Sequence, residues 1–234
     1  MLSEHARQGR IAFGINHEMT DFKQNRTKNL DLVVCTPAAV KRPTKERTFS
    51  DLADAYAIEL SAKQRSELAK LPILYESAVG AVRIALEAKA CMTEHVKALP
   101  RLYDELNSSH QTVHGAGEQL IAAGLVMVNT AKEFASPGRA TDCPKCGHHF
   151  APVNHHKPEA APRVVAKLAE LPRRSSVADQ GFDALAIVAV ECRNDGSPVK
   201  LVTGAPAPRP EQIFHYGQAI QRLAHLYESR FPRE

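Results

Sequence analysis

The chain has 234 residues, of which 44% are hydrophobic, and its formal net charge is +4. These values are ordinary for a globular protein of one domain with insertions, or one and a half domains, that buries a real core. No apolar run approaches the roughly 20 residues that cross a bilayer, and no apolar signal segment opens the chain, so no membrane partner is expected. Five cysteines, an odd number, argue against a disulfide framework and favour a reducing, cytoplasmic location.

The hydrophobic pattern predicts an α/β fold. The elements expected in the first half of the chain are a helix over 11–22, a strand over 30–35, a helix over 51–70, a strand from 82, and a helix after 93 with a kink or a late start at Pro100. Those expected in the second half are a short helix over 118–123, a strand over 125–129, a short helix over 163–171, a strand over 185–190 with a hairpin partner over 199–203, and a helix over 211–230. Ser108 to Gly117 is expected to be a loop.

The organisation predicted from these elements has three parts. Residues 1–134 form the first part of a core, with a helical insertion at about 49–71. Residues 135–181, where Pro, His, Cys and Arg gather, form an insertion and linker. Residues 182–234 supply final strands and a C-terminal helix that complete the core.

One carboxylate interrupts the apolar strand expected over 30–35. Asp is depleted in strands and is costly to bury without a partner, so Asp31 is a candidate functional residue. The structural alternative is an Asp at the start of the strand, paired with Lys28 or Arg26.

The next predicted strand ends in Glu-x-Lys. Glu87 and Lys89 are two residues apart, and strand side chains with that spacing point to the same face. The carboxylate of such a pair can hold a divalent cation, and the ammonium group can hold a phosphate or a water molecule. A salt bridge at the end of a strand is the structural alternative.

These residues form a recognisable series: an acid in a first helix (Glu18), an acid in a strand (Asp31), and Glu-x-Lys in the next strand (Glu87, Lys89). A helix and another buried strand follow. The series resembles the PD-(D/E)XK superfamily of restriction-endonuclease-like nucleases over roughly residues 10–130. The resemblance implies an α/β fold with a mixed sheet flanked by helices, an active site on adjacent strands, and a helical insertion between them.

The resemblance also implies roles. Asp31 and Glu87 would bind Mg²⁺, since carboxylates are the ligands of hard cations in phosphodiester hydrolysis. Lys89 would orient or deprotonate the attacking water and offset phosphate charge, with its pKa lowered by the neighbouring cation. Glu18 would orient a water or bind a second ion, with a solvated helix residue as the structural alternative.

A second acid-and-base pair competes for this role. Glu191-Cys192-Arg193 ends the strand predicted over 185–190, and Asp183 precedes that strand. A later sheet strand that ends in a salt bridge is the favoured interpretation of this pair.

A Cys/His cluster lies in the predicted insertion. Cys143-Pro-Lys-Cys146-Gly resembles a zinc knuckle, in which a tight turn directs both thiolates at one ion. Two further ligands are needed, and the nearest candidates are His149 and His155, with His148 or His156 as alternates. Structural Zn²⁺ would staple a segment too small for its own core. Redox-active thiols and a metal-free loop remain alternatives.

The function predicted from this constellation is Mg²⁺-dependent endonucleolytic hydrolysis of DNA, as in a restriction-type enzyme. A homodimer is expected, because double-strand cutting usually needs two active sites, and the helix stripes over 51–70 or 211–230 are candidate interfaces. A basic set in the first 50 residues would contact phosphates or form a solvated face: Lys23, Arg26, Lys28, Lys41, Arg42, Lys45 and Arg47. The alternatives are a zinc-containing nucleic-acid-binding or assembly protein without catalysis, and a metal-dependent RNA or repair nuclease.

Overall fold

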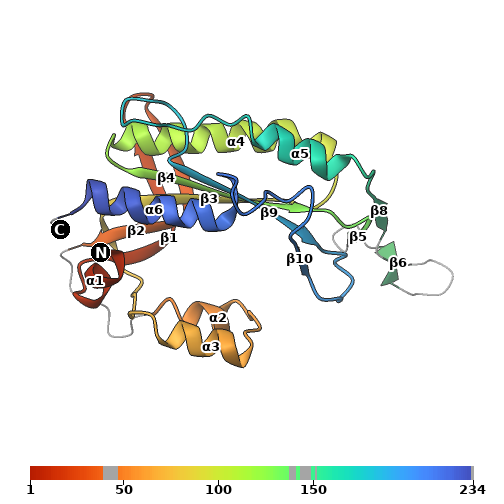
Figure 1. Ribbon diagram of the computed structural model, residues 1–234, viewed down its shortest axis with the longest axis horizontal. Helices are drawn as coiled ribbons and strands as arrows, with labels where there is room; N and C mark the ends of the chain where they lie inside the picture. Colours follow the sequence, from red (N-terminus) through yellow and green to blue (C-terminus); the bar gives the residue numbers. More distant parts are fainter. Residues whose placement is uncertain (39–46, 137–140, 143–148, 151, 233–234) are drawn as a thin grey trace.

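A six-stranded mixed sheet forms the centre of the molecule in the computed structural model (Figure 1). The structure describes residues 1–38, 47–136, 141–142, 149–150 and 152–232, with the side chains of all these except 141–142 and 149–150. The strands occur in the order β1-β2-β3-β4-β9-β10 across the sheet. Their bounds are β1 Ala12–Asp21, β2 Arg26–Pro37, β3 Val79–Cys91, β4 Ile121–Asn129, β9 Ala184–Glu191 and β10 Lys200–Val202.

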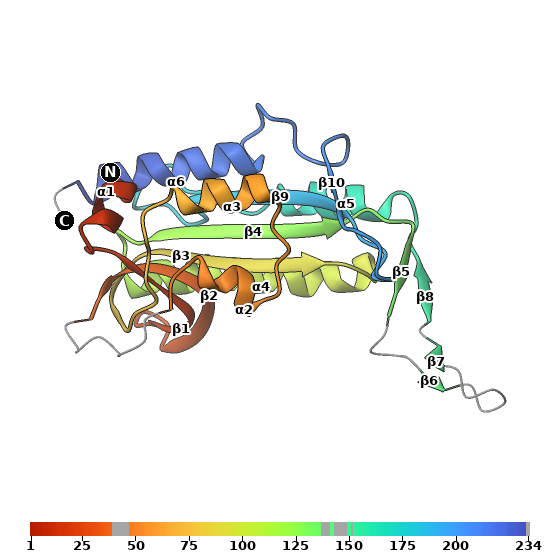
Figure 2. The ribbon, with the colours of Figure 1, turned by 90° about the horizontal axis from the view of Figure 1, so that it is seen from below.

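Helices cover both faces of this sheet, as Figures 1 and 2 show. On one face lie α4 (His95–Ala116) and α5 (Ala160–Leu168). On the other lies α6 (Tyr216–Arg230), with α1 (Leu2–Arg7) against it. The helices α2 (Asp51–Ala55) and α3 (Ala62–Ala69) occupy the connection between β2 and β3. The prediction of an α/β fold with a mixed sheet flanked by helices is therefore confirmed.

The sheet is parallel in its centre and antiparallel toward both edges. β1, β2 and β3 pair antiparallel, whereas β3 pairs parallel with β4 and β4 parallel with β9. β10 returns antiparallel to β9, as the predicted hairpin requires. Parallel neighbours need a crossover, and α4 supplies it between β3 and β4. The carboxyl ends of β3, β4 and β9 consequently meet at one edge of the sheet.

Two apolar layers hold the helices to the sheet. On the α4 face, Leu102, Leu106 and Val113 of the helix pack in one cluster with strand residues such as Val33 and Val126. On the α6 face, a smaller cluster holds the strand residues Ile84 and Ile121 and the aromatic rings of Tyr227 and Phe231. Burial of this aliphatic surface is the main stabilising contribution to the fold.

The segment 11–22 is a strand and not the predicted helix. β1 spans Ala12–Asp21 and pairs along its length with β2. Asn16 has a φ of 50°, in the left-handed region, and the ladder has no pair at this residue. The alternation of side chains between the two faces of the strand is interrupted at Asn16. The apolar residues on either side of it therefore have a spacing in the sequence that resembles that of a helix.

Three further predictions are wrong in detail. α4 continues through Pro100 to Ala116, over the segment predicted as a loop, because its buried side keeps packing on the sheet. The predicted helix over 118–123 is largely replaced by the start of β4, whose Ala-rich beginning is buried on both faces. The predicted helix over 51–70 is divided into α2 and α3, and α3 buries none of its residues.

A ribbon of short strands projects from the carboxyl edge of the sheet (Figure 2). At its base β5 (Glu133–Ala135) pairs with β8 (Val153–His155). Further out β6 (Thr141–Asp142) pairs with β7 (His149–Phe150).

None of the helices in the described part of the chain is both long and apolar enough to span a bilayer.

Alkylation should distinguish the buried cysteines. Cys35 and Cys91 are buried, and burial raises the pKa of each thiol to about 11. Because the thiolate is the nucleophile, we expect iodoacetamide at neutral pH to leave both unmodified in the native protein and to modify them after denaturation. Cys192 is only partly buried and should react in the native state. Peptide mapping by mass spectrometry measures this, and native labelling of Cys35 or Cys91 would contradict it.

Candidate functional site

Asp31 lies where β2 and β3 separate. The β2–β3 ladder runs from Pro37↔Val79 to Leu32↔Leu86. Immediately beyond it, the backbone N–H of Ala88 donates to Asp31 Oδ2 at 2.6 Å. A side-chain carboxylate thus takes the place of a backbone carbonyl between the two strands. This contact holds Asp31 beside the backbone that links Glu87 to Lys89.

Glu87 is buried under α4, and only 1% of its surface is exposed. Its Oε1 lies 2.7 Å from Lys89 Nζ and 3.7 Å from Lys28 Nζ. Its Oε2 is buried and has no hydrogen-bond partner in the described structure. A buried carboxylate oxygen without a partner is costly, so this atom is suited to a ligand.

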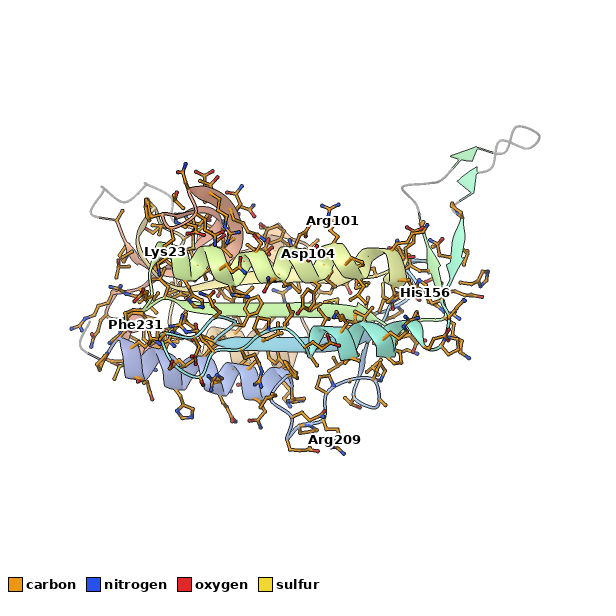
Figure 3. All side chains as sticks on the ribbon, turned by 90° about the horizontal axis from the view of Figure 1, so that it is seen from above. Lys23, Arg101, Asp104, His156, Arg209 and Phe231 are labelled. Atoms are coloured by element: carbon orange, nitrogen blue, oxygen red, sulfur yellow. The ribbon has the colours of Figure 1, made fainter. Side chains whose placement is uncertain are left out.

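The helix α4 supplies the outer wall of this site. Glu105 lies 3.5 Å from Lys89 and 2.6 Å from Arg101, and its backbone carbonyl accepts from Lys28 Nζ at 2.7 Å. The side chains of Lys28 and Lys89 are 20% and 27% exposed, so solvent reaches the site along these two lysines. Figure 3 shows Arg101 and Asp104 on the outer side of α4, pointing away from the sheet.

The pattern analysis predicted part of this site. Asp31, Glu87 and Lys89 come together, and Glu87 and Lys89 share a face as the strand spacing requires. Lys28 is predicted as a basic residue that contacts phosphate or pairs with Asp31, and its contact with Glu87 is not predicted. Glu105 is missed altogether. Its place opposite Lys89 depends on how α4 packs, for which the local sequence carries no signal.

The two lysines differ in acidity. Burial lowers the pKa of Lys28, and Lys89 lowers it further against the opposing effect of Glu87. Burial also lowers the pKa of Lys89, but the hydrogen bond and charge of Glu87, with Glu105 and Asp31, raise it above its ordinary value overall. Lys89 is therefore a hydrogen-bond donor and positive charge at neutral pH. The decrease in the pKa of Lys89 that is expected beside a bound Mg²⁺ stays a prediction.

Glu18 does not complete the site. It lies in β1 opposite Asn29 and not in a helix. Among the residues that the structure describes, no three His, Cys, Asp or Glu side chains are placed to hold one metal ion. The carboxylates that fit a hard cation are therefore Asp31 and Glu87, and one or two carboxylates are what Mg²⁺ usually takes from a protein. The orphan Oε2 of Glu87 is consistent with such a ligand.

The predicted basic surface is largely paired. Lys23 contacts Glu118 at 3.0 Å, Arg26 contacts the buried Asp21 at 3.0 Å, and Arg47 contacts Glu76. Lys41, Arg42 and Lys45 lie outside the described residues. Ion pairs do not prevent phosphate contacts, but they reduce the charge available for them.

The second acid-and-base pair is not one site. Asp183 directly precedes β9, where it is fully buried and contacts Arg230 at 2.6 Å and Arg174 at 3.4 Å. Glu191 is exposed at the other end of this eight-residue strand, about 26 Å away at roughly 3.3 Å per residue. Asp183 is thus part of a structural ion-pair cluster. This agrees with the interpretation of β9 as a later strand of the sheet and not as the site of catalysis.

The predicted zinc ligands are only partly described. Cys143, Cys146 and His148 lie outside the described residues, as does the side chain of His149 in β7. His155, at the base of the ribbon, lies 3.6 Å from Glu133. The ring nitrogens of His156 lie 2.7 Å from the Ala131 carbonyl and 3.2 Å from the Thr93 hydroxyl. Both ring nitrogens of His156 therefore already have hydrogen-bond partners in the main part of the fold. The zinc site stays a prediction.

Comparisons with models of protein families, with curated proteins and with solved structures find no match for this chain. A function must therefore be argued from the arrangement of Asp31, Glu87 and Lys89.

Proposed function

We propose that the protein is a Mg²⁺-dependent endonuclease that hydrolyses DNA phosphodiester bonds and has a restriction-endonuclease-like fold. The observation that carries the proposal is the meeting of three residues at the point where β2 and β3 separate. Asp31 accepts a hydrogen bond from Ala88, and Glu87 and Lys89 flank that residue. The antiparallel β1-β2-β3 unit followed by α4 and a parallel β4 supports it further.

The charges support a phosphate substrate. Around Glu87 gather three cationic side chains and three carboxylates: Lys28, Lys89, Arg101, Asp31, Glu87 and Glu105. The formal charges of these six side chains sum to zero. A bound divalent cation would make the net charge of the site positive, and the site would then attract the anionic phosphodiester.

Each residue has a separate task in the proposed reaction. Asp31 and Glu87 would hold Mg²⁺, with Glu87 Oε2 as the free oxygen. The ion, when bound, supplies charge stabilisation and a more acidic water. Lys89 donates a hydrogen bond to the attacking water or to a phosphate oxygen and offsets the developing negative charge. Lys28 holds Glu87 in place from the other side.

Two features of the proposal concern assembly. The segment around Cys143 and Cys146 would bind structural Zn²⁺ and form a small insertion at the end of the β5–β8 ribbon. A homodimer would bring two sites to the two DNA strands. Ile213, Tyr216 and Ile220 belong to the stripe over 211–230 that is predicted as a candidate interface. They are 45–52% exposed, which leaves the first turns of α6 and the residue Ile213 before them open to a second copy.

One observation favours a second candidate function, a nucleic-acid-binding or assembly protein without catalysis. Glu87 is 1% exposed and lies between two lysines, as a purely structural ion cluster would. The two functions make opposite predictions for cleavage.

The experiment uses supercoiled plasmid with Mg²⁺ or EDTA. We expect the wild type to nick or linearise the plasmid only with Mg²⁺, and Asp31→Asn to be slower by on the order of 10²-fold or more. Asn retains the oxygen that accepts from Ala88, so the strands should keep their positions. Asp104→Asn, on the exposed side of α4, is the matched control and should cut like the wild type. Absence of cutting by the folded wild type on DNA and RNA would support the binding protein.

A further inference from the structure

A pocket of about 480 Å³ lies at the carboxyl edge of the parallel strands, beside the base of the ribbon. The residues that line it come from β8, from the segment between β8 and α5, and from the first turns of α4 and α5. Figure 3 places the labelled His156, one of these residues, at the end of the sheet beside α5. Crevices at the carboxyl ends of parallel strands are the usual ligand sites of α/β sheets. The volume is ordinary for a small-molecule site.

Two helix N-termini face this pocket. The 22 residues of α4 and the nine of α5 both begin at its wall. The first N–H groups of a helix have no intrahelical acceptor, and the helix dipole adds positive potential there. In α5 the Ala160 N–H donates to the Lys157 carbonyl and Pro162 has no N–H, so α5 contributes mainly its dipole. Phosphate groups are common ligands of such ends.

The charged side chains of the pocket are predominantly cationic. Lys97, Lys157 and Arg163 line it together with two carboxylates, Glu94 and Glu159. Glu94 already lies 3.4 Å from Lys97. Lys157 and Arg163 therefore remain as the cations best placed to meet an anion.

An independent observation points to a ligand that can donate a hydrogen. His95 lines the pocket and is 3% exposed. Its Nε2 lies 2.8 Å from the Asn129 carbonyl oxygen, which can only accept, so Nε2 carries the hydrogen. Its Nδ1 is buried and has no hydrogen-bond partner in the described part of the chain. In the neutral ring, Nδ1 is an acceptor without a donor.

Asn129 makes this wall rigid. Its side-chain amide donates to the carbonyls of Met92 and Cys192 and accepts from the backbone N–H groups of Ala131 and Cys192. The carboxyl ends of β3, β4 and β9 are joined through this one side chain. The carbonyl that orients His95 is consequently fixed, which preorganises Nδ1 for a ligand.

We propose that this pocket binds the phosphate of a phosphomonoester. The N-terminal turn of α4, Lys157 and Arg163 bind the phosphate oxygens, and a P–OH group donates to His95 Nδ1. The group comes either from a phosphorylated small molecule or from the 5′-phosphate of a nucleic-acid strand. The site has none of the residues of the Asp31–Glu87–Lys89 site in its lining, so it stands whether or not the protein cleaves DNA.

Phosphate and sulfate separate this proposal from general anion binding. Sulfate has the same shape but carries no hydrogen at neutral pH, so it cannot donate to Nδ1. In calorimetric titrations of the wild type at matched ionic strength, we expect saturable binding of inorganic phosphate and at least tenfold weaker binding of sulfate. Equal affinities, or no saturable phosphate binding, would overturn the proposal.

Variants then locate the site. Arg163→Gln and Lys157→Gln should each weaken phosphate binding by about tenfold, because each removes a charge-assisted hydrogen bond. Lys63→Gln, on the exposed helix α3, is the control and should bind like the wild type. His95→Phe, if it folds, should lose the preference for phosphate over sulfate. Unchanged affinity in both the Arg163 and Lys157 variants would contradict the assignment.

The source of the phosphate is distinguished by three probes: a nucleoside 5′-monophosphate, a 5′-phosphorylated oligonucleotide, and the same oligonucleotide without its phosphate. Tighter binding of the mononucleotide supports a small-molecule ligand, and tighter binding of the phosphorylated oligonucleotide supports a strand end. Equal binding of the two oligonucleotides, with no effect of Arg163→Gln on either, would overturn the proposal.

Discussion

Replacing Lys89 with glutamine is expected to slow Mg²⁺-dependent cleavage of supercoiled DNA by on the order of 10²–10³-fold. The glutamine amide can still donate a hydrogen bond to Glu87, but it carries no charge. If Lys89 stabilises charge that develops on the phosphate, the rate falls although the hydrogen bond is kept. If Lys89 is only a structural partner of Glu87, the rate stays near that of the wild type.

Two comparisons make this result specific. Lys89→Arg keeps the charge but changes its shape, so it should retain more activity than Lys89→Gln. Lys63→Gln is the control, since Lys63 is exposed on α3 and lines neither proposed site, and its rate should be unchanged. Circular dichroism and the urea midpoint establish that each variant is folded. Wild-type activity in folded Lys89→Gln would refute the catalytic role.

The three residues of the candidate site could be predicted because each depends only on strand geometry. A period of two places Glu87 and Lys89 on one face, and an Asp within an apolar strand indicates a special position. Their neighbours could not be predicted in the same way. Glu105 reaches Lys89 from a helix, and the register between helix and strand is set by packing that no local pattern specifies.

The errors in secondary structure have similar causes. β1 was predicted as a helix because Asn16, with a positive φ, interrupts the alternation of its side chains. The start of β4 was predicted as a helix because Ile121 to Ala123 are buried on both faces, so no alternation is visible. In both strands the tertiary environment, and not local propensity, determines the structure.

Replacing Asp183 with asparagine is expected to destabilise the protein by about 3–5 kcal/mol. The Asp183 carboxylate is fully buried, contacts Arg230 at 2.6 Å and Arg174 at 3.4 Å, and accepts from the Ala122 N–H at 2.8 Å. Asn can keep the bond to Ala122 but leaves two buried arginines without their counter-charge. The contacts join α6 to the start of β9, so their loss should weaken the whole sheet.

Urea unfolding of the wild type, Asp183→Asn and the control Asp104→Asn measures this change in the free energy of unfolding. The control, whose side chain is exposed, should differ from the wild type by less than about 0.5 kcal/mol. If Asp183→Asn lowers the free energy of unfolding by less than about 1 kcal/mol, the prediction is wrong. Solvent would then compensate the two arginines for the lost counter-charge. The cleavage rate per folded molecule should not change. Asp183 is not part of the Asp31–Glu87–Lys89 site, and it lies at the opposite end of β9 from Glu191, its partner in the competing candidate pair. A variant that stays folded but is inactive would instead return Asp183 to the catalytic candidates.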